Sequence, residues 1–302
     1  MKTLVAVIGP TAIGKTKISI ALAQYYNTEI ISADARQLYR ELNIGTAKPS
    51  ESELQLIPHH FINHCSIHQH YSAGDFQKEA LESIYHLYSS HDVLIITGGS
   101  GLFIRAVLQG LNEFPEVDKK IEQYLSDIFE LEGISSLQNL LREHDPEYYK
   151  IADLNNCRRL LRALSVSLSS GKPYSDFTKK EIQERSFDVI KIGLQLDRST
   201  LYQRINFRVD DMMQNGLLQE AQHLKPFSHL NALQTLGYQE LFDHLDGKLT
   251  LSDAVNLIKQ HSRNYAKRQL TWFKKDQDVT WFNPDALQEI ISFVEERRQK
   301  KL

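Results

Sequence analysis

The sequence has few of the features that would assign a protein to a class directly, and the first of these is cysteine. Cys65 and Cys157 are the only two among 302 residues, and they lie far apart without CxxC spacing. This rules out a disulfide framework and a cysteine-based zinc finger, and it is typical of proteins from a reducing cytosol.

Long apolar runs are also missing. No stretch approaches the roughly 18 consecutive apolar residues that a membrane-spanning helix needs. The apolar run at residues 3–8 is too short for a signal peptide and is interrupted by Gly9 and Pro10 before the charged Lys15. We therefore expect a cytoplasmic protein that has no membrane partner.

An excess of positive charge is absent as well. The chain carries 35 Lys and Arg against 38 Asp and Glu, which gives a formal net charge of −3. Such a balance creates no general attraction for nucleic acid, so any RNA-binding surface has to be a local basic patch. The hydrophobic share of 41% is ordinary for a folded protein and argues against disorder.

Short apolar runs alternate with helical patterns along much of the chain. Residues 3–8 form a β-branched, apolar run that is typical of a strand buried on both faces, and a helical pattern follows at 17–26. The other predicted strands are residues 29–32, 92–97, 191–196 and, as an edge strand, 279–282. The alternation predicts an α/β core with a parallel sheet and crossover helices.

The pattern changes between residues 116 and 186, where we predict helices and no strand. The helical segments are 117–131, 134–142 and 155–169, and the Gly-Lys-Pro that follows breaks the last of them. We therefore expect a helical insertion domain over 116–186. The core would then consist of residues 1–115 and 187–302, with a mainly helical C-terminal part.

Residues 9–16, GPTAIGKT, fit the phosphate-binding pattern GxxxxGK[ST] between a predicted strand and a predicted helix. Glycines let backbone N–H groups turn toward a phosphate, and the helix N-terminus adds its positive end. Lys15 supplies a positive charge, and the Thr16 hydroxyl is suited to Mg²⁺. The predicted phosphate-binding residues are Gly9, Thr11, Ala12, Ile13, Gly14, Lys15 and Thr16.

The kind of phosphate is less firmly specified by this motif. ATP and GTP sites usually have an aspartate at the end of a second strand, but here the strand runs into GGSG at residues 98–101. The sequence also lacks the NKxD motif with which GTPases read their base. These absences favour a diphosphate that is not part of a nucleotide, with an ATP-using small-molecule kinase as an alternative.

Asp34 follows the second predicted strand, at the carboxyl end of the sheet, where α/β proteins bind ligands. A carboxylate beside a phosphate site is suited to act as a general base or to anchor a metal. It is equally suited to cap the next turn. Spacing alone leaves the three roles open.

Ten blocks of the sequence, in order, resemble the tRNA dimethylallyltransferases (tRNA isopentenyltransferases) of bacterial type. The resemblance spans nearly the whole chain, and IGTAKP and YAKRQLTWF are more specific than the phosphate-binding motif. The blocks are GPTAIGKT at 9–16, DARQLYRELNIGTAKP at 34–49, PHH at 58–60, YSAGDF at 71–76, GGSGLF at 98–103, NNCRRLLRAL at 155–164, GKPYSDF at 171–177, LYQRINFRVDDM at 201–212, LGYQEL at 236–241 and YAKRQLTWF at 265–273.

The resemblance implies a P-loop NTPase-like core and a reaction. A dimethylallyl group would pass from dimethylallyl diphosphate to the exocyclic N6 of the adenosine that is 3′-adjacent to the anticodon of tRNA. The P-loop would hold the diphosphate, with Mg²⁺ at Thr16. Asp34 matches the family's catalytic acidic residue, which takes the proton of the adenine amine, and Arg208 matches the arginine that neutralises the departing diphosphate.

The resemblance also implies contacts with the tRNA anticodon stem-loop. Arg159 and Arg162 are three residues apart on one predicted helical face, which suits a phosphate backbone. Two local departures from the family pattern are Ala35, where a serine is usual, and LNN at 154–156, where Pro-Asn-Asp is usual. The implied tRNA-binding residues are Asp34, Ala35, Arg36, Gln37, Gly101, Arg158, Arg159, Leu160, Leu161 and Arg162.

Three other functions compete with this prediction. A free-nucleotide isopentenyltransferase would act on AMP or ADP, but it has no use for the long insertion. A kinase would have no need of an insertion bearing arginines, and a non-catalytic RNA-binding module would not need Lys15, Thr16 and Asp34 together. We expect the protein to be a monomer.

Two further signals receive little weight. His60, His64 and His68 are four residues apart and would share one face of a helix, as metal ligands do, but Pro58 and the intervening residues do not define a helix. Trp272 follows basic residues and is suited to stack on RNA, yet its helical spacing with Leu270 favours a place in the core.

Overall fold

A computed structural model describes residues 2–178 and 183–300 of the chain. The chain divides into two compact units, a larger one made of Met1–Gln109 and Glu184–Leu302 and a smaller one made of Gly110–Gln183. The smaller unit begins and ends earlier than the predicted 116–186. Its first residues make their contacts within it, since Asn112 Nδ2 donates to the Phe177 carbonyl at 2.7 Å.

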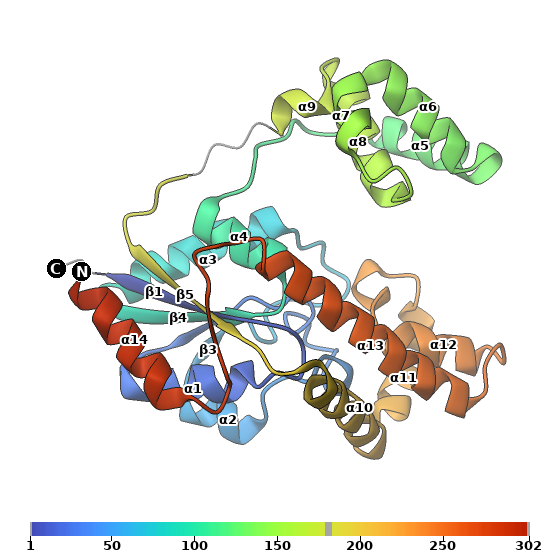
Figure 1. The fold of residues 1–302 in the computed structure, drawn as a ribbon. Coiled ribbons are helices and arrows are strands. Elements are labelled where there is room, and N and C mark those ends of the chain that lie inside the picture. Colours follow the sequence, from blue (N-terminus) through green and yellow to red (C-terminus); the bar gives the residue numbers. More distant parts are fainter. Residues whose placement is uncertain (1, 179–182, 301–302) are drawn as a thin grey trace. The chain divides into compact units, whose positions relative to one another are not determined.

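The larger unit contains a six-stranded sheet in the order β3-β2-β4-β1-β5-β6 (Figure 1). All neighbouring strands are parallel, which confirms the predicted α/β core. The central strands are buried on both faces, as their unbroken apolar runs require. The strands are β1 Thr3–Ile8, β2 Ile30–Ser32, β3 His59–His60, β4 Val93–Gly98, β5 Asp188–Leu194 and β6 Thr280–Phe282.

One strand prediction needs correction, and one strand was missed. β5 begins at Asp188 and ends at Leu194, so the predicted segment 191–196 lies too far along the chain. β3 was not predicted, because only two residues pair with β2 and they carry no apolar alternation.

Helices cover both faces of the sheet. Alternate residues of β1 point to opposite sides, so that Leu4 and Ala6 contribute to one hydrophobic core and Val5 and Val7 to the other. α3 and α4 lie on the first face, and α1 and α14 on the second (Figure 1). The helices of this unit are α1 Lys15–Tyr25, α2 Glu51–Leu56, α3 Ala73–Leu87, α4 Gly101–Gln109, α10 Arg198–Gln214, α11 Leu217–Leu224, α12 Tyr238–Leu245, α13 Leu251–Phe273 and α14 Leu287–Gln299, with 3-10 turns η1 Ile44–Thr46, η2 Lys225–Phe227 and η3 Asn231–Leu233.

The strand register brings three loops to one edge of the sheet. Ile8, at the end of β1, pairs with Gly98 at the end of β4, and Ser32, at the end of β2, pairs with Thr97. The phosphate-binding loop, Asp34 and the glycines after β4 therefore leave the sheet side by side. This is the edge where ligands bind in doubly wound folds.

The smaller unit is entirely helical within its described residues, in agreement with the helices predicted for it. Its core consists of Leu125, Leu137, Leu141, Leu160, Ala163 and Leu164. Buried Asp145 joins two short helices, because it caps Tyr148 N at 2.9 Å and also accepts from Ser175 N at 2.7 Å. The helices are α5 Lys119–Glu132, α6 Ile134–His144, α7 Pro146–Ile151, α8 Cys157–Ser170 and α9 Tyr174–Phe177.

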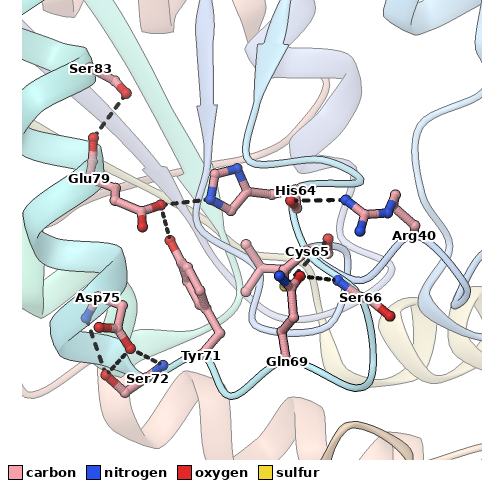
Figure 2. Close-up of polar contacts among 11 residues, drawn as sticks. Arg40, His64, Cys65, Ser66, Gln69, Tyr71, Ser72, Asp75, Glu79 and Ser83 are labelled. Atoms are coloured by element: carbon pink, nitrogen blue, oxygen red, sulfur yellow. Dashed lines mark hydrogen bonds and ion pairs between the residues drawn. The ribbon is translucent and has the colours of Figure 1, made fainter.

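The histidine-rich segment is not a helical metal site. His60 lies in β3, and His64 belongs to the loop that follows. His64 Nε2 meets the Glu79 carboxylate of α3 at 2.6 Å, and Tyr71 OH donates to the same carboxylate at 3.0 Å (Figure 2). In the described ranges, no group of three His, Cys, Asp or Glu side chains is placed to hold a metal ion. The His64–Glu79 contact instead links the loop after β3 to α3.

Among the described residues, no helix is both long enough and apolar enough to span a bilayer.

Candidate active site at the carboxyl edge of the sheet

The loop between β1 and α1 has the backbone shape of an anion cradle. Ala12 and Gly14 have φ of 60° and 105°, and Gly14 is the N-cap of α1. Within residues 2–178 and 183–300, the N–H groups of residues 12–16 donate to no protein atom. Since the first N–H groups of a helix lack intrahelical partners, these five donors are available to an anion at the start of α1.

Lys15 folds back over this loop. Its Nζ donates to the carbonyls of Gly9 at 3.1 Å and Pro10 at 2.8 Å. Burial lowers the pKa of the Lys15 ammonium to about 8; Arg208 lowers it further, while Asp34 acts in the opposite direction. A bound phosphate would supply the negative charge that restores the ordinary pKa of this group.

Asp34 lies just beyond β2 and caps the turn that it begins. Its Oδ1 accepts from the N–H groups of Arg36 at 2.9 Å and Gln37 at 3.3 Å. Oδ2 has no hydrogen-bond partner in the part of the chain that the structure describes. Capping and chemistry are therefore compatible, because one oxygen fixes the carboxylate and the other is left for a substrate.

Arg208 reaches the same place from α10. Burial lowers the pKa of its guanidinium, and the nearby charge of Asp34 opposes that change. An arginine stays protonated in proteins despite such a shift. The structure thus brings together the three charged residues that the sequence singled out, Lys15, Asp34 and Arg208, from elements far apart in the chain.

The segment that begins at Asp34 is tied down by its own side chains. The Arg36 guanidinium donates to the carbonyls of Asn231 at 3.1 Å and Ala232 at 3.2 Å. Gln37 Nε2 donates to Thr46 O at 3.1 Å. The Ala35 N–H donates to Ser100 Oγ at 2.9 Å, although Ala35 itself lacks the usual hydroxyl. Residues 34–37 are therefore presented in a fixed conformation.

Glu220, on α11, was not singled out from the sequence. Its carboxylate accepts from the N–H groups of Asn43, Ile44 and Gly45 at 3.1, 2.9 and 3.0 Å. It also accepts from the hydroxyl of buried Tyr238 at 2.6 Å. Three N–H groups at a turn form an anion-binding nest, and here a side chain of the protein fills it. No motif around Glu220 announces this contact.

The glycines after β4 allow close approaches. A Cβ on Gly98 would lie 2.1 Å from Ala33 O, and a Cβ on Gly99 would lie 2.3 Å from Gln269 Nε2. Gln269 was also missed, although it belongs to a block that was recognised as specific. Its buried amide accepts from Thr11 N at 2.8 Å and donates to Gly99 O at 2.9 Å.

Trp272 lies at the surface, so the predicted place in the core is wrong. The side chain is 41% exposed, and a Cβ on Gly101 would lie 2.2 Å from its indole nitrogen. The guanidinium of Arg105 lies 5.9 Å from the ring centre. Gly101, one of the predicted tRNA contacts, therefore leaves room for the exposed Trp272 ring, which lies beside the Arg105 cation.

The insertion arginines lie on α8 in the smaller unit. Arg158, Arg159 and Arg162 are all exposed, and the Arg162 guanidinium lies 5.5 Å from the centre of the Phe114 ring. Leu160 is fully buried in the core of this unit. Its side chain therefore packs inside rather than facing a partner, which corrects its inclusion among the direct contacts.

The residues at the start of α1 fit a magnesium ion. The Thr16 hydroxyl has no hydrogen-bond partner among the residues described, and it sits at the end of the phosphate cradle. Mg²⁺ in phosphate sites takes one or two protein oxygens and otherwise phosphate oxygens and water. The Thr16 hydroxyl meets that requirement without a dedicated protein cage.

Comparison with known proteins identifies the family of the chain. The IPP transferase family model matches residues 37–276. The chain is 46% identical to tRNA dimethylallyltransferase 1 of Phocaeicola vulgatus, with 97% of each chain covered. It is 50% identical to tRNA dimethylallyltransferase of Christiangramia forsetii, with 93% of each covered.

Solved structures give the same result for the fold. The tRNA isopentenylpyrophosphate transferase of Bacillus halodurans matches with a TM-score of 0.75 at 35% identity, covering 100% of this chain and 98% of that one. A eukaryotic dimethylallyltransferase captured acting on tRNA matches with a TM-score of 0.78 at 28% identity, covering 99% and 78%. The P-loop NTPase-like fold and the bacterial-type resemblance are confirmed, and the chain belongs to the IPP transferase family, the tRNA dimethylallyltransferases.

Proposed function

We propose that this protein transfers the dimethylallyl group of dimethylallyl diphosphate to N6 of the adenosine 3′-adjacent to the anticodon of tRNA, releasing diphosphate. The observation that carries the proposal is the cradle of N–H groups at residues 12–16, which have no partner in the described chain, together with the nearby charges of Lys15, Arg208 and Asp34. Such a site offers positive charge to a leaving diphosphate and a base to an attacking amine.

The leaving group takes most of the stabilisation in this mechanism. As the bond between the allylic carbon and the diphosphate oxygen breaks, negative charge grows on the diphosphate. The amides of residues 12–16, Lys15 and Arg208 are already in place to receive it, so little reorganisation is needed. Mg²⁺, when bound at Thr16 and the phosphate oxygens, would add positive charge at the same oxygens.

Asp34 acts on the nucleophile. The adenine amine attacks the allylic carbon in line with the departing oxygen, and it must lose a proton as the new bond forms. Asp34 Oδ2 accepts that proton, while the N–H groups of Arg36 and Gln37 hold Oδ1 in place. An adenine reaches such a site only after leaving its stack, at a cost of a few kcal/mol.

The tRNA is held by two sets of residues in this proposal. Residues 34–37 and Gly101 contact the nucleotide at the sheet edge. Arg158, Arg159 and Arg162 contact the phosphate backbone, which needs positive charge rather than an exact geometry. The protein works as a monomer in the cytoplasm.

The direct test follows radiolabel from dimethylallyl diphosphate, with Mg²⁺, into unmodified tRNA, beside reactions that offer AMP and ADP. We expect label in tRNA alone. Label in AMP or ADP would assign the protein to free-nucleotide prenylation. If no acceptor is labelled, transfer from labelled ATP to small molecules would test the kinase alternative.

A further inference from the structure

Gln269, on α13, packs against the P-loop, and the proposed reaction gives this contact no role. Its side chain is 6% exposed, and it spans from the loop after β1 to the loop after β4. Oε1 accepts from Thr11 N at 2.8 Å, and Nε2 donates to Gly99 O at 2.9 Å. The two partners fix the orientation of the amide, since an N–H donor must face the oxygen and a carbonyl must face the nitrogen.

The bridge changes which donors of the loop a ligand can use. The N–H groups of residues 12–16 are free within the described chain, but that of Thr11 is already taken. A phosphate chain that starts at the N-terminus of α1 therefore meets N–H donors as far as Ala12. Beyond that residue it meets the carbonyl oxygen of Gln269, which repels a further anionic group.

Gly99 makes this arrangement possible. A Cβ at this position would lie 2.3 Å from Gln269 Nε2 and 3.7 Å from Lys15 Nζ. The amide nitrogen of Gln269 and the ammonium nitrogen of Lys15 therefore lie within about 6 Å of each other. In P-loops that hold nucleoside triphosphates, this lysine reaches the outermost phosphates. Gln269 therefore lies where the third phosphate would make its contacts.

We propose that Gln269 restricts this P-loop to diphosphate ligands and excludes triphosphates. The inference rests on the proposed function, in which the diphosphate of the donor fills the same cradle. A third phosphate would have to displace the Gln269 amide. Displacement would break the hydrogen bonds of the Gln269 amide to Thr11 and Gly99 and leave Gly99 O without its partner, which is unfavourable. Gln269 is thus a specificity-determining residue for the number of phosphates.

The experiment compares inorganic pyrophosphate with inorganic tripolyphosphate, each with Mg²⁺, by isothermal titration calorimetry on the full chain. The wild-type protein should bind tripolyphosphate at least about tenfold more weakly than pyrophosphate, although tripolyphosphate carries more charge. Gln269→Ala should remove most of that preference, a change of about tenfold in the ratio of the two dissociation constants. Thr271→Ala, at an exposed position of the same helix, is the matched control and should keep the wild-type ratio.

Gln269→Met provides a second variant that keeps the side-chain volume and lacks the two polar atoms. If Gln269→Ala does not fold, Gln269→Met takes its place, and its melting temperature shows whether it retains the fold. Equal affinity of the wild-type protein for both phosphates would overturn the inference, and so would a ratio that neither variant changes. Transfer of label to tRNA by the wild-type protein is scored separately, so failure of the donor assignment remains distinguishable from failure of the Gln269 assignment.

Discussion

The sheet edge and the small helical unit carry their site residues in two different ways. Near the sheet edge, loops are held by elements from elsewhere in the chain, as Gln269 holds Thr11 and Glu220 holds residues 43–45. On α8, Arg158 and Arg159 simply project from an exposed helical face. The difference follows from the tasks, since bond formation needs reacting groups in fixed positions, whereas contact with a phosphate backbone needs charge in roughly the right place.

Among substitutions at the sheet edge, those of Asp34 should have the largest effect. We expect Asp34→Ala to lower the rate of transfer to tRNA by about 10³-fold, since a positioned general base contributes roughly 10²- to 10⁴-fold. The affinity for tRNA, measured by filter binding, should stay within a factor of about three of wild type, because residues of the smaller unit supply the phosphate contacts. Asp34→Asn keeps the shape and the capping oxygen and serves as the control for local folding. Near-normal rates in either variant would remove Asp34 from the chemistry.

Close packing at the sheet edge should make its glycines intolerant of substitution. We expect Gly98→Ala to lower the free energy of unfolding by about 3 kcal/mol, since its Cβ would lie 2.1 Å from the Ala33 carbonyl and the backbone must shift. Gly74→Ala, in the first turn of α3, is the control; its Cβ would meet nothing closer than 3.5 Å. Urea denaturation of both variants measures the effect. Equal stabilities would show that the edge adjusts more easily than its contacts indicate.

Lys15 gives ligand binding at the sheet edge a pH dependence. The pKa of Lys15 is lowered to about 8, and a bound diphosphate raises it again, so binding takes up a proton above pH 8. Affinity for pyrophosphate should therefore be greatest below pH 8 and fall roughly 5- to 10-fold between pH 7.5 and 9.

The control for this pH dependence is Lys15→Arg, which keeps the positive charge and does not titrate in this range. Calorimetry at fixed Mg²⁺ concentration would record both profiles, and their ratio removes the titration of the ligand itself. Parallel profiles would contradict the lowered pKa.

The smallest effect is expected on α8. Arg159→Glu should weaken tRNA binding by roughly three- to tenfold at moderate salt and reduce the steepness of its salt dependence by about one to two counterions. Affinity for pyrophosphate should not change. Lys150→Glu, on the neighbouring α7, is a control with an equal change of charge. Lys150 already pairs with Glu147 at 2.6 Å, so we expect it to contribute less to tRNA binding. Unchanged tRNA affinity in Arg159→Glu would take this arginine out of the interface.

The elements that form locally were predictable from the sequence. The apolar run of β1, the glycines of the P-loop and the start of α1 follow one another, so each is specified by its neighbours. Lys15 and Asp34 were likewise identified from their residue types and positions, whereas Arg208 was identified only through the resemblance to the family. The errors fell where local signals are weak: β3 has only two paired residues, and Trp272 has helical spacing that does not reveal how open its surroundings are.

The sequence by itself determined the α/β class, the phosphate cradle and the charged groups around it. The tertiary structure alone decided how the cradle is completed, since Thr11 and Gln269 are 258 positions apart and meet only when α13 crosses the sheet edge. The same holds for Glu220, which reaches residues 43–45 from α11. A hydrogen bond depends on which groups arrive within about 3 Å of each other, and that distance is fixed by packing rather than by any local pattern.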